Sequence, residues 1–362
     1  MPNKQAILVV LIALFSGLAA ACNGSKAAPE ERAAAAPGKA GTPKKEIVRT
    51  LTLGAYTTPR EVYGNAVIPA FQKEWKQKTH EEVRFEQSYQ GSGAQARAII
   101  GGFEADVAAL SLEPDVQKIA DAGLIKNAWR EGPFGGMVSR SIVVIGVRPG
   151  NPKGIKDWDD LAKPGLAVVT PNVKTSGGAM WNVLAVYGAA FRGHTKAKAG
   201  DAAAAEALLE KVLANVTVMD KGARESMLTF ERGIGDAIIT YENEVLAAKN
   251  AGRAYDYVIP KSTILIENPV AVVDGYAGRH GVKDVAEAFV KFLATPASQE
   301  AFAKGGYRPV DDKVAAGFAD KFPKVEDLFS VRDFGGWPQL VKTLFADGAA
   351  YDKVIAAVSE KK

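Results

Sequence analysis

The sequence predicts an α/β protein in which sheets are flanked by helices. Short runs rich in β-branched and aromatic residues alternate with segments whose apolar residues recur at helical spacing, and Gly or Pro stands at many of the boundaries. This alternation is typical of chains that pack helices against sheets. About 315 residues remain after the N-terminal leader and tail, which is enough for two lobes of ordinary size.

The first 22 residues resemble an export signal. Lys4 precedes an apolar run at 6–14, and small residues then lead to Cys22. The run is too short to span a bilayer as a retained helix. Residues 18–22 resemble a lipobox, although Leu18 stands one place further from the cysteine than is usual, and a plain secretory signal is the alternative. We expect residues 1–22 to be a lipoprotein-type signal peptide, with the exported protein lipidated at Cys22.

The tail after Cys22 predicts a flexible tether. Residues 23 to about 45 contain no apolar side chain larger than Ala, so they bury too little surface to offset the entropy of ordering, and we place the tether at 23–46. Cys22 is the only cysteine, which excludes an intramolecular disulfide or a cysteine-rich metal site in the mature protein. The net charge of +4 arises from charges scattered along the chain, without a basic block suited to nucleic acid.

The elements follow in order from the local pattern. We expect strands at 48–56, 83–89, 105–112, 141–147, 166–170, 216–219, 237–241 and 270–274. Apolar spacing predicts helices between them, as in Val67, Phe71 and Trp75. Beyond residue 274 the pattern is mostly helical, at 285–293, 297–303 and 340–358, and we expect these segments to brace the lobes.

Three places share one construction, a strand followed by a turn of small residues and then a helix start. They are residues 89–93, 174–178 and 221–225. Each exposes unpaired backbone N–H groups, glycine lets the main chain approach a ligand, a Ser or Thr hydroxyl adds a donor, and the helix dipole favours an anion. One such turn is more often a structural cap. Three on an exported chain, at the carboxyl ends of strands, predict a site for a small, doubly charged anion.

Catalytic and cofactor sites find little support. Residues 91–96 fit a loose dinucleotide pattern, but the turn follows the second strand, and an exported protein has little access to nicotinamide cofactors. His80, His194 and His280 are not spaced as metal ligands, and solvated loop positions explain them better. Glu242 and Glu244 are more typical of a helix first turn than of a catalytic pair. We therefore predict no catalytic residue, no metal and no cofactor.

Five segments carry a family likeness. Residues 91–96, 150–161, 170–178, 232–236 and 306–309, in this order and spacing, resemble the periplasmic sulfate-binding proteins. The resemblance covers nearly all of the chain after the tether. It implies a two-lobed class II periplasmic-binding-protein fold with a ligand cleft between lobes, a periplasmic location, a monomer, and delivery of sulfate or a related oxyanion to an ABC importer permease. Lobe 1 would comprise 47–137 plus 261–310, lobe 2 would comprise 138–260, and 311–362 would form C-terminal bracing helices.

The resemblance also implies ligand contacts, position by position. They fall on Thr57, Ser92, Ser176, Gly177, Gly178, Ala223 and Tyr241. Thr57 replaces the family's aspartate, where the contact is a main-chain N–H, and Tyr241 replaces a tryptophan whose indole N–H points at sulfate. A phenol donates or accepts, so we expect either weaker discrimination against protonated oxyanions or room for a larger anion. Gln90, Met180 and Glu225 also depart from the family pattern.

A competing hypothesis is an exported hydrolase that binds a sulfate or phosphate ester in the same anion site. It would need a nucleophile, base or metal beside the bound ester. Glu225, Tyr241 and Glu242 are the nearby candidates, and none has an evident partner in the sequence. The choice among sulfate, thiosulfate, molybdate and phosphate stays open at this stage.

Overall fold

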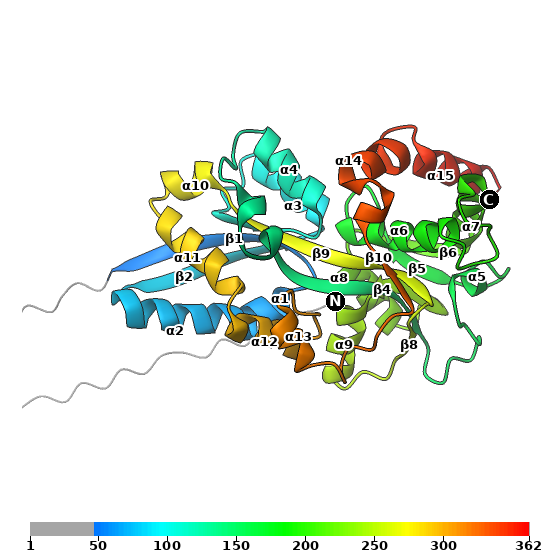
Figure 1. Cartoon of the computed structure of the whole chain (residues 1–362), viewed down its shortest axis with the longest axis horizontal. Coiled ribbons are helices and arrows are strands. Elements are labelled where there is room, and N and C mark those ends of the chain that lie inside the picture. The colour runs from blue at the N-terminus through cyan, green and yellow to red at the C-terminus, as the bar shows by residue number, and fades with distance from the viewer. Residues whose placement is uncertain (1–46, 362) are drawn as a thin grey trace, which may run out of the picture. The chain divides into compact units, whose positions relative to one another are not determined.

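The computed structural model describes residues 47–361 (Figure 1). The predicted signal peptide with Cys22, and the predicted tether, lie outside the described residues. The strands are β1 (Val48–Tyr56), β2 (Glu82–Gln90), β3 (Val107–Ala109), β4 (Met137–Val147), β5 (Val168–Pro171), β6 (Val216–Asp220), β7 (Ala237–Tyr241), β8 (Asp256–Val258), β9 (Ser262–Val272) and β10 (Asp327–Phe329).

Helices cover the strands on both faces. The α-helices are α1 (Arg60–Val62), α2 (Ile68–Thr79), α3 (Ser92–Ile100), α4 (Glu113–Asp121), α5 (Trp158–Leu161), α6 (Gly177–Phe191), α7 (Ala202–Ala214), α8 (Ala223–Glu231), α9 (Glu242–Asn250), α10 (Asp274–Arg279), α11 (Lys283–Leu293), α12 (Pro296–Lys304), α13 (Asp312–Ala316), α14 (Gly336–Leu340) and α15 (Ala350–Glu360). Short π or 3-10 helices are η1 (Tyr63–Val67), η2 (Trp129–Glu131), η3 (Pro133–Gly136), η4 (Val331–Phe334) and η5 (Val341–Phe345).

The strands pair in the order β2-β1-β3-β9-β4-β7-β5-β6, with β8 added to β4 and β10 added to β9. The neighbours of β1 are parallel to it, as are β7 and β6 to β5. β9 and β4 pair antiparallel between these two parallel groups. We call β1 to β3 with their helices the first lobe, and β5 to β8 with theirs the second lobe.

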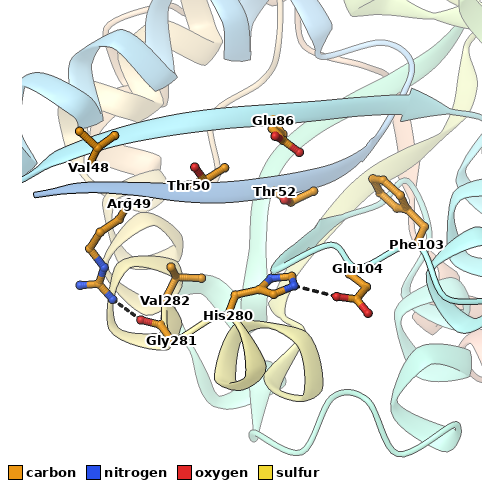
Figure 2. Close-up of a pocket in the computed structure, with 10 residues that line it drawn as sticks. All are labelled: Val48, Arg49, Thr50, Thr52, Glu86, Phe103, Glu104, His280, Gly281 and Val282. Atoms are coloured by element: carbon orange, nitrogen blue, oxygen red, sulfur yellow. Dashed lines mark hydrogen bonds and ion pairs between the residues drawn. The ribbon is translucent and has the colours of Figure 1, made fainter.

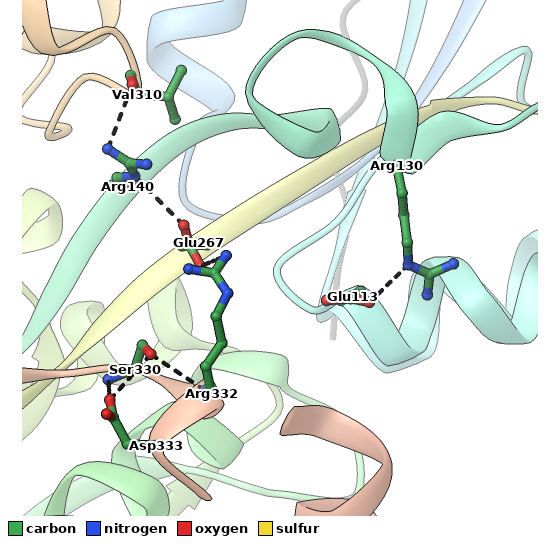
Figure 3. Close-up of polar contacts among 8 residues, drawn as sticks. All are labelled: Glu113, Arg130, Arg140, Glu267, Val310, Ser330, Arg332 and Asp333. Atoms are coloured by element: carbon green, nitrogen blue, oxygen red, sulfur yellow. Dashed lines mark hydrogen bonds and ion pairs between the residues drawn. The ribbon is translucent and has the colours of Figure 1, made fainter. Parts of the chain in front are cut away.

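β4 and β9 connect the two lobes (Figure 1). The carboxyl end of β9 pairs with β3, whereas the carboxyl end of β4 pairs with β7 and β8. Where the two strands pair with each other, Glu267 lies opposite Arg140. Figure 3 shows Glu267 between Arg140, whose Nε lies 3.6 Å from Oε1, and Arg332, whose Nη2 lies 3.2 Å from Oε2. The C-terminal segment is thereby tied to the crossing strands.

The core of each lobe has two sides because strand residues alternate between faces. In the first lobe, Val107 and Ala109 pack with an aromatic cluster that includes Phe71 and Phe289. Ala108, between them, packs on the opposite side with α3 and α4.

The second lobe follows the same rule. Val143 and Ile145 face α6 and α7, while Val144 faces α8 and α9. The C-terminal α15 packs on α7, and the indole rings of Trp181 and Trp337 meet edge to face at 4.8 Å.

The predicted α/β alternation is confirmed. The strands predicted at 48–56 and 237–241 match β1 and β7 residue for residue, and the helices predicted at 285–293, 297–303 and 340–358 correspond to α11, α12, and the run from α14 to α15. The strand predicted at 270–274 is wrong at its start, because β9 begins at Ser262. β8 and β10 were not predicted, since three residues carry no periodic pattern.

Candidate functional site

Three helices begin where a parallel strand has just ended, at the three turns that the sequence singles out. α3 follows β2, α6 follows β5 and α8 follows β6. Their N-cap residues are Gly91, Ser176 and Gly222, and none of these caps makes a side-chain hydrogen bond to the helix. The first N–H groups of all three helices therefore remain available to another acceptor.

The starts of α6 and α8 lie against each other. A methyl group in place of a Gly178 hydrogen would lie 3.2 Å from Cβ of Ala223 and 3.2 Å from Oγ of Ser176. The same methyl group would lie 3.5 Å from Cε1 of Tyr241, so the phenol ring borders this turn. Glycine at this position leaves room for the backbones to approach.

Residues of the first lobe approach these turns at Gly91 and at Gly222. A methyl group at Gly91 would lie 2.5 Å from the carbonyl oxygen of Thr175 and 2.9 Å from that of Lys221. One at Gly222 would lie 3.5 Å from Oγ1 of Thr57. The start of α3 and the end of β1 therefore approach the starts of α6 and α8.

Ser111, at the end of the β3 segment, links the two sets of residues. Its hydroxyl lies 2.6 Å from the Tyr241 hydroxyl, and its N–H donates to Oγ of Ser92 at 3.1 Å. A methyl group at Gly177 would lie 2.9 Å from the Ser111 hydroxyl oxygen. Ser111 thus contacts residues of both lobes.

The hydroxyl of Ser92 is already engaged within the protein. It donates to Oδ2 of Asp115 at 2.7 Å and accepts from the N–H of Ser111 at 3.1 Å. A serine hydroxyl carries a single proton. Ser92 can therefore offer a ligand its backbone N–H at the start of α3, but no hydroxyl proton in this arrangement.

The structure brings all the sequence-predicted site residues into this one region, and all of them are buried. Thr57 and Ser92 come from the first lobe, and Ser176, Gly177, Gly178, Ala223 and Tyr241 come from the second. Of the residues that depart from the family pattern, Glu225 is exposed and its Oε2 lies over Gly222, where a methyl group would approach it to 2.5 Å.

Arg224 joins the two lobes beside Ala223. Its Nη2 donates to Oε2 of Glu61 at 2.8 Å and to the carbonyl oxygen of Thr58 at 3.3 Å, both in the first lobe. Its Nε lies 3.2 Å from Oε2 of Glu244, which is fully buried on α9. Burial raises the pKa of Glu244 to about 7, although the attraction of Arg224 acts in the opposite direction.

A groove of about 690 Å³ lies along this inter-lobe contact. Glu61 and Asn65 line it from the first lobe, and Arg224, Glu231 and Asn243 line it from the second.

Sequence reasoning missed Ser111, Arg224 and Glu244 as parts of this region. Ser111 carried a usable signal, because it is a polar residue near the carboxyl end of a predicted strand, where ligands gather in open α/β sheets. The buried pairing of Arg224 with Glu244 had none, since the two residues lie on different helices.

A separate pocket of about 560 Å³ lies on the first lobe (Figure 2). It is lined by Val48, Arg49, Thr50, Thr52, Glu86, Phe103, Glu104, His280, Gly281 and Val282. His280 is not a merely solvated histidine, because its Nε2 lies 2.8 Å from Glu104 and its Nδ1 lies 2.7 Å from Asp106. The hydrogen bond to Glu104, with that to Asp106, raises the pKa of His280. None of the sequence-predicted site residues lines this pocket.

Residues 47–361 contain neither a cluster of metal ligands nor a helix suited to span a membrane. No three His, Cys, Asp or Glu side chains in this part of the chain are placed to hold a metal ion. Among the same residues, no helix has the length and apolar character needed to cross a membrane.

Comparison with known proteins places these features in context. A family model described as bacterial extracellular solute-binding protein matches residues 51–308. A protein named sulfate-binding protein from Synechococcus elongatus is 45% identical over 315 residues, covering 85% of this chain and 87% of the relative. A thiosulfate-binding protein from Pseudomonas aeruginosa is 38% identical, covering 83% of this chain and 90% of the relative.

A solved structure agrees with both. The sulfate-binding protein SubI from Mycobacterium tuberculosis H37Rv matches with a TM-score of 0.76 and 37% identity, over 82% of this chain and 100% of that one. The predicted two-lobed periplasmic-binding fold is thereby confirmed. From its sequence and its architecture alike, the chain belongs to the family of bacterial extracellular solute-binding proteins.

Proposed function

We propose that this protein binds sulfate, or a closely related tetrahedral oxyanion, between its lobes and delivers it to the permease of an ABC importer. Relatives that share more than a third of their residues with the chain are named for sulfate or thiosulfate binding. They are named as binding proteins and not as hydrolases. No observation on the described residues favours the ester hydrolase.

The convergence of three uncapped helix starts carries this proposal. N–H groups at Ser92, Gly177 and Ala223 meet in one buried region contributed by both lobes. A dianion removed from water needs several donors to offset its lost hydration. Each partly buried helix start contributes up to about 2 kcal/mol toward an anion. Such a set of N–H groups suits an ion that bears charge on several oxygens.

Each sequence-predicted residue then has a role in the proposed site. Thr57, Ser92, Gly177, Gly178 and Ala223 would donate through backbone N–H groups, which do not depend on side-chain identity. Ser176 would donate through its hydroxyl, which makes no capping bond to α6. Tyr241 would contribute through its phenol, whose ring borders Gly178.

Location and anchoring remain part of the proposal. We place the mature protein in the periplasm as a monomer, attached to a membrane by a lipid on Cys22. The sequence pattern of residues 1–22 supports the anchor. Mass measurement of the mature N-terminus tests it, since an unmodified or absent Cys22 would contradict the anchor.

Isothermal titration of the mature protein tests the central proposal. Sulfate, thiosulfate, molybdate and phosphate are titrated separately, and we expect heat of binding with sulfate or one of its relatives. Ser176→Ala should weaken binding by about 1.5 to 3 kcal/mol because a hydrogen bond to a charged oxygen is lost. Ser298→Ala is the control, since Ser298 is also buried but lies on α12. The absence of heat with all four anions would reject the function.

A further inference from the structure

Two buried hydroxyl groups meet beside the start of α6. Oγ of Ser111 and Oη of Tyr241 lie 2.6 Å apart, and the two residues are 1% and 0% exposed. Ser111 follows β3 of the first lobe, whereas Tyr241 ends β7 of the second. The pair lies against the first turn of α6, because a methyl group at Gly177 would come within 2.9 Å of the Ser111 hydroxyl.

The surroundings fix the position of Ser111. Its N–H donates to Oγ of Ser92, and its carbonyl oxygen accepts from Nε1 of Trp181 at 3.0 Å and from Nδ2 of Asn268 at 3.2 Å. These bonds come from three different elements, α3, α6 and β9. The serine hydroxyl therefore remains within reach of the Tyr241 phenol.

A proton count shows what the pair can offer. Each hydroxyl carries one proton, and burial raises the pKa of Tyr241 well above its ordinary value, so the phenol keeps its proton. One of the two protons fills the contact between the oxygens. Neither hydroxyl has a second side-chain partner within residues 47–361. The other proton is therefore free to donate to a ligand.

We propose that Ser111 is a specificity-determining residue which, with Tyr241, presents a hydrogen-bond donor to the bound anion and favours oxyanions that carry no proton. This inference rests on the proposed binding of a tetrahedral oxyanion between the lobes. Sulfate supplies an acceptor for the remaining proton from any of its oxygens. In this arrangement Ser111 donates to the Tyr241 oxygen, and the phenol proton is directed to the anion.

A protonated oxyanion meets a penalty at the same pair. Hydrogen phosphate could donate its O–H to the Tyr241 phenol only by displacing the proton of Ser111. That serine proton would then lose its acceptor, and a buried donor without a partner is costly. A phenol alone both donates and accepts. The hydrogen bond from Ser111 occupies the acceptor position of Tyr241, which leaves the phenol only its proton to offer. The phenol therefore acts toward the anion as an indole N–H would, and discrimination against protonated oxyanions is preserved.

Anion selectivity of three single-residue variants tests this inference. Affinities for sulfate and for phosphate are measured by titration calorimetry at about pH 8, where phosphate carries one proton and sulfate none. In Ser111→Ala and in Tyr241→Phe, the ratio of phosphate Kd to sulfate Kd should fall about tenfold or more, because the remaining hydroxyl can accept from the anion and also donate to it. Ser298→Ala should leave the ratio unchanged. Circular dichroism melting verifies that each variant folds.

The possible results are distinct. A lowered ratio in both site variants supports the inference. An unchanged ratio, whether or not both affinities weaken together, overturns the specificity role while leaving anion binding intact. If the native protein binds neither sulfate nor phosphate, the proposed function itself fails. Tyr241→Phe conserves the buried ring, so the experiment remains decisive even if Ser111→Ala does not fold.

Discussion

The carboxyl group of Glu244, at the contact between the lobes, has a raised pKa because it is buried. Glu244 is fully buried, and the charged groups that influence it are Arg224, Glu61, Glu225 and Glu231, of which only Arg224 is a cation. Burial raises the pKa values of the Tyr56 and Tyr307 phenols, and the nearby Glu244 raises them further. The Glu244 carboxyl group therefore keeps its proton in the folded protein until the pH approaches about 7.

This raised pKa predicts a pH-dependent stability. The folded state retains the Glu244 proton up to about pH 7, whereas an unfolded chain releases it near the ordinary value of 4.5. The folded state thus binds more protons between these values, so the free energy of unfolding should fall as pH rises from about 5 to 7. Urea denaturation of Glu244→Gln across this range should show a shallower fall.

His280 provides the control for that measurement. Its raised pKa contributes stability that is fully present below 6.5 and is lost as pH rises through the folded value, which is the same direction. His280→Gln should therefore remove a different part of the slope, at higher pH. If Glu244→Gln had the same pH profile as the native protein, Glu244 would titrate normally in the fold.

The sequence identified the residues of the candidate site better than it identified their partners. Ser92 and Tyr241 were singled out by turn chemistry and resemblance, and both are buried in the predicted region. The Ser92 hydroxyl donates to Asp115, 23 residues away, because α3 packs on α4. The contact of Tyr241 with Ser111 spans 130 residues. Pairings over such separations leave no local pattern to read.

At the scale of elements, close backbone contact between the starts of helices sets how nearly the lobes approach. Gly91, at the N-cap of α3, faces the carbonyl oxygens of Thr175 and Lys221 in the second lobe. Its φ of −55° is open to any residue, so only this contact opposes a side chain. Backbone carbonyls, unlike flexible side chains, cannot rotate away.

Gly91→Ala should therefore separate the two lobes without unfolding either. The added methyl would lie 2.5 Å from the Thr175 oxygen, and relieving such overpacking typically costs about 1 to 3 kcal/mol. We expect sulfate affinity to fall about tenfold or more by titration, while the melting temperature of the anion-free protein stays close to native. Gly278→Ala, where nothing lies within 4 Å of the added methyl, is the matched control. Native affinity in Gly91→Ala would contradict the close approach.

Helix starts were easier to predict than the crossing strand β9. Each of the three helices begins at its predicted turn because small residues and a preceding strand leave a clear local signal. The middle of β9 contains Glu267, Asn268 and Pro269, which interrupt the expected apolar pattern. The buried Asn268 donates a hydrogen bond to the carbonyl oxygen of Ser111, and Glu267 forms ion pairs with Arg140 and Arg332. Tertiary contacts, which the local pattern does not contain, satisfy these polar groups.

At the scale of the whole molecule, one carboxylate fastens the C-terminal segment to the second lobe. Asp327, on β10, accepts from Nε and Nη2 of Arg192 at 2.9 and 2.7 Å and from the Ser262 hydroxyl at 2.6 Å. The Arg192 contact, with that of Ser262, lowers the pKa of Asp327 to about 2. These bonds join the end of α6, the start of β9 and the chain beyond it.

Asp327→Asn should loosen this attachment. The lowered pKa implies a stabilisation of roughly 2 kcal/mol that is present above the unfolded pKa of 3.8 and is lost as pH falls through about 2. The variant should therefore unfold at lower urea concentration at neutral pH, and the difference should shrink in acid. Asp320→Asn, at an exposed position, serves as control. An undiminished difference at low pH would show that charge is not the cause.

The interleaving of the two lobes along the chain also governs when the protein can acquire its structure. β3 needs β9 beside it, so the sheet of the first lobe stays incomplete until residue 272 has left the ribosome. The second lobe requires segments that are synthesised later still, namely β10, which pairs with β9, and α15, which packs on α7 and ends at Glu360. A partly synthesised chain therefore lacks a complete hydrophobic core in either lobe and cannot fold stably. Such a chain stays extended enough to cross a membrane before its lobes are complete.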